Sequence, residues 1–304
     1  MNKKYVIIGK NGQVGSKLCF YLGKAAKSFS HNECDFANFE ATKDLLDTYK
    51  PEAIFNACAY TNVDKAETEH SECYKANADI PYILAKYCKM HDIPLVHYST
   101  DYVYSGKGNT PNKEDDLPSP VNIYGKSKLA GEQNIIKTNC KHLIFRTSWV
   151  YDELNKNFLT TMMRLAKEKN EISIVSDQIG SPTYASDLAE ISVEALKNTY
   201  TKKSFPSGVY NLCNQGETSW YEFANNIFCN AKKLGINLQI KNTKKISTSE
   251  YPTPAERPLN SRLDCSKAKY VLNIQMPSWE QSLKKCMERL VENTKNTYRG
   301  SACS

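Results

Sequence analysis

A tyrosine and a lysine four residues apart, Tyr124 and Lys128, are well suited to acid–base chemistry. On a helix, residues with this spacing share one face, so the phenol and the ammonium would be neighbours. A free phenol has a pKa of about 10, and a nearby cation favours the phenolate and lowers that pKa. The pair is therefore predicted to transfer a proton at neutral pH, with Tyr124 as the donor. A surface pair without a function is the alternative interpretation.

A hydroxyl group upstream of this pair completes a possible catalytic set. The apolar run Leu95-Val-His-Tyr-Ser-Thr100 is typical of a buried strand, and it ends on Thr100. Functional groups of parallel sheets lie at the carboxyl ends of the strands. Thr100 is therefore expected to hydrogen-bond a substrate carbonyl beside Tyr124.

A glycine-rich loop precedes these residues. Gly9-Lys-Asn-Gly12-Gln-Val-Gly15 has the spacing GxxGxxG and separates a strand-like run, Tyr5–Ile8, from a helical pattern. Glycines allow a tight turn and a close approach to a pyrophosphate, which the N-terminus of the following helix attracts. The loop predicts a dinucleotide site, although a helix-starting turn that binds nothing would have the same sequence.

Strands and helices alternate through the first half of the chain. Strands are expected at 5–8, 53–58, 93–98 and 142–147, and helices at 14–24, 80–88 and 124–136. This order predicts an α/β fold, a Rossmann-type doubly wound parallel sheet. After about Trp149 the pattern shortens, up to a terminal helix over 279–290. We therefore expect an NAD(P)-binding domain over 1–148. Residues 149–304 would form mainly a smaller substrate-binding lobe, with some segments returning to the first domain.

The composition excludes several classes of function. The 304 residues include 40 Lys and Arg against 33 Asp and Glu, a net charge of +7, but the lysines are scattered along the chain. No concentrated basic face suggests nucleic-acid binding, and no apolar run approaches the roughly 20 residues of a membrane helix. The N-terminus lacks the features of a signal peptide, which favours a cytoplasmic protein. The 11 cysteines include no CxxC pair and are expected to be reduced thiols.

Together, the glycine spacing, Thr100 and the YxxxK pair resemble the extended short-chain dehydrogenases/reductases. A closer resemblance is to the dTDP-4-dehydrorhamnose reductase family. It rests on the segments His97–Tyr104, Asn122–Glu132, Phe145–Tyr151, Asp177–Thr183 and Tyr251–Pro258. The resemblance implies reduction of the C4 ketone of dTDP-4-dehydro-L-rhamnose in nucleotide-sugar biosynthesis.

The resemblance also implies roles for individual residues. Catalysis falls to Tyr124, Lys128 and Thr100, and Tyr124 and Lys128 also contact the cofactor. The other implied cofactor contacts are Gly9, Gly12, Gln13, Val14, Gly15, Asp35, Phe36, Ala59, Tyr60 and Thr61. The implied substrate contacts are Thr100, Asp101, Trp149 and, facing the nucleotide diphosphate, Arg257.

Two departures from the family refine these expectations. The segment 27–31, where the second strand should end, contains no acid to bind the ribose of NADH. NADPH or NADH is therefore expected as cofactor, with NADPH favoured. Some family members carry an acid just after the glycine loop as part of a magnesium-linked dimer. Ser16-Lys17 stands there instead, which predicts no metal site and, if the protein is a homodimer, no metal bridge.

Three alternative functions share part of this sequence pattern. A sugar-nucleotide dehydratase needs an acid after the strand-end Asp101, where this chain has Tyr102. Another epimerase or reductase of the same family is separated only weakly by motif spacing. A non-catalytic binding protein, like the regulatory subunit of methionine adenosyltransferase, has no need of an intact Thr100, Tyr124 and Lys128.

Overall fold

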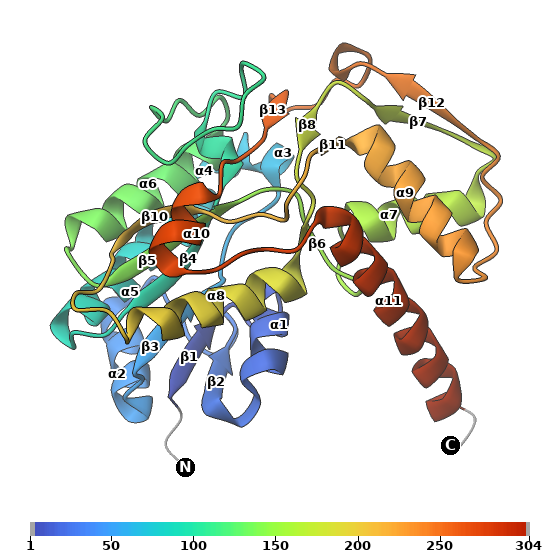
Figure 1. Cartoon of the computed structure of the whole chain (residues 1–304). Coiled ribbons are helices and arrows are strands. Elements are labelled where there is room, and N and C mark those ends of the chain that lie inside the picture. The colour runs from blue at the N-terminus through green and yellow to red at the C-terminus, as the bar shows by residue number, and fades with distance from the viewer. Residues whose placement is uncertain (1–3, 302–304) are drawn as a thin grey trace.

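A six-stranded parallel sheet forms the centre of the molecule, with the strand order β10-β5-β4-β3-β1-β2 (Figure 1). The computed structural model describes residues 4–301. The strands are β1 (Tyr5–Ile8), β2 (Ala26–Phe29), β3 (Ala53–Asn56), β4 (Leu95–Thr100), β5 (His142–Thr147) and β10 (Gly208–Asn211). The predicted doubly wound α/β fold is confirmed.

The strand order places a crevice at the carboxyl ends of β1 and β3. From β1 the chain first moves outward to β2, and it then returns to the other side of β1 to form β3. The connections on the two sides of this point diverge, which leaves room above the strand ends for a ligand. The glycine loop follows β1 directly at this crevice.

Helices cover both faces of the sheet because successive strand residues point to opposite sides. Ile7 and Phe55 pack in the apolar cluster with α1 (Gln13–Leu22), α8 (Ala185–Thr199) and α10 (Ser266–Leu272). Val6 and Ile8 pack in the opposite cluster with α2 (Phe39–Tyr49), α5 (Ile80–Met90) and α6 (Ile123–Lys137). Both clusters are fully buried at their centres, so these helices are fixed relative to the strand ends.

A second core is built by the later part of the chain. It contains α7 (Phe158–Glu168), α9 (Trp220–Lys233) and α11 (Trp279–Ser301), which pack around Phe223 and Ile174. Beside them β7 (Glu171–Val175) pairs in parallel with β12 (Asn242–Ile246). Figure 1 shows this group to the right of the main sheet, and α11 continues past the expected end at Leu290.

Short elements complete the fold. Near the strand ends lie α3 (Val63–Ala66), α4 (His70–Tyr74) and the π-helical turn η2 (Lys75–Asp79). The 3-10 turns are η1 (Gly23–Ala25), η3 (Asp101–Val103) and η4 (Thr248–Glu250). Small ladders pair β6 (Val150–Tyr151) with β9 (Thr183–Tyr184), and β8 (Ile179–Gly180) with both β11 (Thr218–Ser219) and β13 (Asn260–Ser261).

The chain crosses from one core to the other several times after β5. β10 joins the edge of the main sheet beside β5, and α8 packs against α1. No helix within residues 4–301 combines the length and the apolar character that crossing a membrane requires.

Candidate active site

The glycine loop packs closely against protein backbone at the N-terminus of α1. Gly9 has a φ of 92°, and a Cβ there would lie 2.6 Å from the backbone nitrogen of Cys58. A Cβ on Gly15 would overlap the carbonyl oxygen of Gly9, whereas one on Gly12 would meet nothing closer than 3.5 Å. Gly12 precedes α1, and no side chain caps this helix end. The helix amides are therefore accessible, as a bound pyrophosphate requires.

Gln13 connects this loop to the second core instead of pointing its side chain into the site. Its Nε2 donates to the carbonyl of Val150 at 3.2 Å, and its Oε1 accepts from Asn157 at 3.1 Å. Gln13 and Val14, the first residues of α1, therefore offer their backbone amides to a ligand.

The residues predicted to contact the adenosine half of the cofactor differ in their exposure to solvent. Asp35 and Thr61 are exposed, whereas Phe36 is 2% exposed and packs in the core cluster under the sheet. The loop that carries Ala59 and Tyr60 follows β3 and is partly buried. The Phe36 side chain thus packs into the core of this region.

Lys128 lies under the strand-end residues of β4. Its side chain is 1% exposed, and Nζ donates to the carbonyl oxygen of Tyr98 at 2.6 Å. The Nε2 atom of His97 lies 3.5 Å from the same nitrogen. Burial lowers the pKa of Lys128 to about 8 and lowers that of His97 well below its usual value. The ammonium is therefore positioned by the β4 backbone.

Tyr124 lies one helical turn away from Lys128, and its phenol lies beside the side chain of Thr100. Burial raises the pKa of Tyr124, and the nearby Asp101 carboxylate raises it further. The expectation that Lys128 lowers this pKa is therefore wrong for the free protein. Desolvation raises it, and the Lys128 ammonium is engaged by the Tyr98 carbonyl. The phenol remains protonated, which is the form that a proton donor needs.

Asp101 is a buried carboxyl group next to this pair. It is 2% exposed; Oδ1 accepts from the Thr100 hydroxyl at 3.0 Å, and Oδ2 has no hydrogen-bond partner. Burial raises the pKa of Asp101 to about 6, against the Thr100 hydrogen bond, which lowers it. An unpaired buried acceptor at the strand end is suited to a ligand hydroxyl.

Trp149 is held in a strained backbone conformation. Its φ is 48°, and its ring stacks on Trp220 with 3.6 Å between centroids and 12° between planes. A Cβ on Gly180 would lie 2.8 Å from the Trp149 ring and 2.9 Å from Ser261. A side chain larger than glycine at position 180 would therefore displace the ring. Positive φ in a bulky residue persists only where its surroundings enforce it, often at a binding site.

Arg257 reaches the same region from the C-terminal part of the chain. Its guanidinium pairs with Asp64 at 2.7 Å and lies 3.5 Å from the Tyr102 hydroxyl. The Tyr102 ring packs edge-on against Tyr124, with 5.4 Å between centroids. Arg257 is thus connected through Tyr102 to the predicted proton donor, and Asp64 orients its planar fork.

Comparison with known proteins identifies the family. The sequence profile of the family described as "RmlD substrate binding domain" matches residues 3–292. The chain is 40% identical over 296 residues to dTDP-4-dehydrorhamnose reductase of Salmonella typhimurium, covering 95% of this chain and 98% of the relative. It is 39% identical over 295 residues to the Shigella flexneri reductase, with the same coverage. The chain belongs to the dTDP-4-dehydrorhamnose reductase family.

Solved structures of the family agree with the architecture. The Bacillus anthracis dTDP-4-dehydrorhamnose reductase in complex with NADP superposes with a TM-score of 0.87. It is 36% identical, and the match covers 95% of this chain and all of that one. The resemblance inferred from the five sequence segments is confirmed for the whole fold.

Two further buried groups of the dTDP-4-dehydrorhamnose reductase fold support helix α6, which carries Tyr124 and Lys128. Glu132, one turn beyond Lys128, accepts from Ser99 at 2.5 Å and from Arg146 at 2.6 Å. Arg146 also donates to the Tyr104 hydroxyl at 2.7 Å. This ion pair locks α6 against β4 and β5 below the site. Sequence reasoning assigned it no role, because nothing in the sequence pairs two residues that meet only when α6 covers the sheet.

The π-helical turn η2 supplies a second support. Its Asn77 is fully buried, accepts from the Tyr60 amide at 2.9 Å and donates to Ser127 at 3.0 Å. A Cβ on Gly131 of α6 would overlap the Asn77 carbonyl, so the two helices pack closely. Asn77 thus joins the predicted adenosine loop to the helix that carries Tyr124. π-bulges of this kind are frequent at functional sites.

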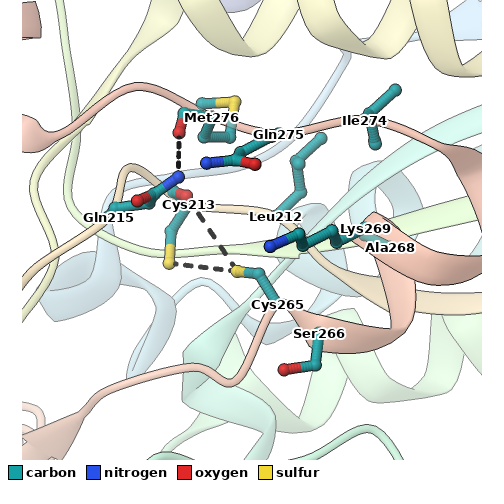
Figure 2. Close-up of a pocket in the computed structure, with 10 residues that line it drawn as sticks. All are labelled: Leu212, Cys213, Gln215, Cys265, Ser266, Ala268, Lys269, Ile274, Gln275 and Met276. Atoms are coloured by element: carbon teal, nitrogen blue, oxygen red, sulfur yellow. Dashed lines mark hydrogen bonds between the residues drawn. The ribbon is translucent and has the colours of Figure 1, made fainter.

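A separate cavity of about 200 Å³ lies between the end of β10 and α10 (Figure 2). Cys213 and Cys265 line it with 3.5 Å between their sulfur atoms, and Gln215 donates to the Met276 carbonyl. No predicted site residue lines this cavity. It therefore does not contribute to the site around Tyr124.

Proposed function

We propose that this protein reduces the C4 ketone of dTDP-4-dehydro-L-rhamnose to dTDP-L-rhamnose with NADPH or NADH. The observation that carries the proposal is the grouping of Thr100, Tyr124 and Lys128 at the carboxyl end of β4, in a chain of the dTDP-4-dehydrorhamnose reductase family. The open N-terminus of α1 lies at the same edge of the sheet and fits a pyrophosphate. Gly9, Gly12 and Gly15 would admit it, with the amides of Gln13 and Val14 as donors.

Proton donation is the part of the reaction that this chain performs. When bound, a reduced nicotinamide would supply a hydride, that is, a proton with the electron pair that becomes the new C4–H bond. Negative charge then develops on the sugar O4, and the protonated Tyr124 donates its proton there. Thr100 orients the carbonyl, and the Lys128 ammonium stabilises the phenolate that remains. A proton from solvent restores the phenol.

The substrate would be held by groups on three segments. Asp101 offers an unpaired buried oxygen to a sugar hydroxyl, and Trp149 presents a fixed aromatic surface. Arg257 suits the diphosphate because its fork binds two oxygens at once. Asp64 keeps that fork oriented until the substrate competes for it.

The organisation of the molecule is also proposed. We infer an NAD(P)-binding domain over 1–148 and a mainly substrate-binding lobe over 149–304, which lends segments such as β10 to the first domain. We place the reaction in the cytoplasm, where the ten thiols that are free in the described part of the chain would stay reduced. A homodimer, if formed, is expected to need no metal. Sedimentation with and without a chelator tests this, and dissociation by the chelator would contradict it.

Ligand binding and turnover together test the proposed function. Purified protein is incubated with the keto-sugar nucleotide and each reduced cofactor, and the sugar product is identified. The proposal predicts dTDP-L-rhamnose. An epimerised ketone would indicate another enzyme of this fold. Binding of both ligands without turnover would indicate a non-catalytic binding protein.

A further inference from the structure

An acidic side chain reaches the end of β2, although the strand itself ends without one. Glu33 lies in a turn beyond the strand, and its Oε2 accepts from the Ser30 amide at 2.8 Å and the Ser30 hydroxyl at 2.9 Å. The ammonium of Lys10 pairs with the same oxygen at 2.7 Å. These contacts lower the pKa of Glu33 to about 2, so the group is an anion at neutral pH. Residues 27–31 alone therefore do not show that an acidic side chain reaches the end of β2.

The group is placed beside the glycine loop by backbone hydrogen bonds. The amides of Gly9 and Lys10 both donate to the Phe29 carbonyl, at 2.8 and 3.1 Å. This joins the start of the loop to the last residue of β2. In doubly wound sheets, groups at the end of this second strand face the ribose of the adenosine half of a dinucleotide.

An anion site at this strand end is occupied by a side chain of the protein itself. Ser30 and Lys10 provide the donors, and the Glu33 carboxylate accepts from them. An amide, a hydroxyl and an ammonium converge on one carboxylate oxygen. The same three donors match a phosphate group. The Glu33 and Lys10 side chains are 40% and 32% exposed, so a ligand can reach this site from solvent.

We propose that Glu33 sets the balance between NADH and NADPH by occupying the position that the 2′-phosphate requires. This inference rests on the proposed function, which supplies the cofactor. The 2′-hydroxyl of NADH donates to the Glu33 carboxylate with the anion site intact. The 2′-phosphate of NADPH must displace that carboxylate from Ser30 and Lys10 and then lies near its charge. Glu33 thus favours NADH, and Lys10 favours NADPH.

Cofactor dissociation constants of two variants test this without any turnover. Glu33→Gln is expected to tighten NADPH about tenfold relative to NADH, because a like charge is removed from the phosphate. Lys10→Met is expected to weaken NADPH about tenfold and NADH much less. Calorimetric titration of each purified variant with each reduced cofactor gives both constants.

A second ion pair provides matched controls. Lys4 and Glu52 are 3.5 Å apart and exposed, at the opposite edge of the sheet where β1 and β3 begin. Glu52→Gln and Lys4→Met change the net charge equally and are expected to leave the NADPH-to-NADH ratio unchanged. The inference would be overturned if the ratio of the NADPH and NADH dissociation constants changed no more in Glu33→Gln and Lys10→Met than in these controls. A wild-type chain that binds neither cofactor would instead contradict the proposed function.

Discussion

The Lys128 ammonium donates to the carbonyl oxygen of Tyr98, 2.6 Å away, from a site where the side chain is 1% exposed. Burial lowers its pKa to about 8. The lysine therefore loses its proton near physiological pH, and with it the charge that stabilises the Tyr124 phenolate. We expect the alkaline pH dependence of the reaction to follow from this burial.

We predict that kcat/KM falls as the pH rises through about 8, because this parameter follows the protonation state of the free enzyme. Lys128→Arg keeps the positive charge at all accessible pH values. That variant is expected to be less active, since its guanidinium does not fit the Tyr98 carbonyl in the same way. It is also expected to lack the fall in kcat/KM at alkaline pH. Steady-state rates over a pH series measure both. An unchanged limb in Lys128→Arg would assign the titration to another group.

Asp101→Asn is predicted to stabilise the protein at neutral pH. Burial raises the Asp101 pKa to about 6, whereas an unfolded aspartate titrates at about 4. Between these values only the folded state holds the proton, so wild-type stability falls as the pH rises from about 4 to about 6. Above about pH 7 the variant should gain on the order of 2 kcal/mol in unfolding free energy, and near pH 4 the gain should disappear.

Urea unfolding of both proteins at the two pH values measures this difference directly. Only the difference between the proteins is interpreted, since other carboxyl groups titrate equally in both. A stability difference that does not vary with pH would show that Asp101 is not a buried titrating group.

Tyr124→Phe is predicted to bind the cofactor normally and to lose roughly 10²–10⁴ in turnover, the usual contribution of a positioned acid. The ring still packs edge-on against Tyr102, so the fold is expected to survive. Cofactor titration and single-turnover rates separate the two effects. Near-wild-type turnover would remove Tyr124 from the role of proton donor.

Breaking the Glu132–Arg146 pair is predicted to destabilise the protein by about 3–5 kcal/mol in either Glu132→Met or Arg146→Met, because each leaves a buried charge unpaired. The double variant should recover much of this loss. The exposed pair of Arg164 and Glu168, 2.7 Å apart, provides the control. Arg164→Met should cost less than about 1 kcal/mol. Additive losses in the double variant would exclude a direct interaction.

The order of strands and the catalytic segment could be predicted from sequence because their signals are local. Each strand of the sheet's centre is a short apolar run buried on both faces, and Tyr124 and Lys128 are neighbours by helical geometry alone. The position of Thr100 at a strand end could be predicted because one such apolar run ends at this residue.

Contacts between distant segments could not be predicted in the same way. Arg257 meets Asp64, and Arg146 meets Glu132, only after the sheet has formed. The direction of the Tyr124 pKa depends on burial, which the YxxxK spacing does not report. Glu33 was missed because the strand end was expected to carry its own acid, whereas a turn returns the carboxylate to Ser30.

Turnover of dTDP-4-dehydro-L-rhamnose by the purified protein is the most direct measurement of the central claim, that a phenol beside Thr100 protonates the reduced C4 oxygen. With NADPH or NADH present, the loss of nicotinamide absorbance should match the dTDP-L-rhamnose formed, mole for mole. Saturating binding of cofactor and keto-sugar with no loss of that absorbance would contradict it.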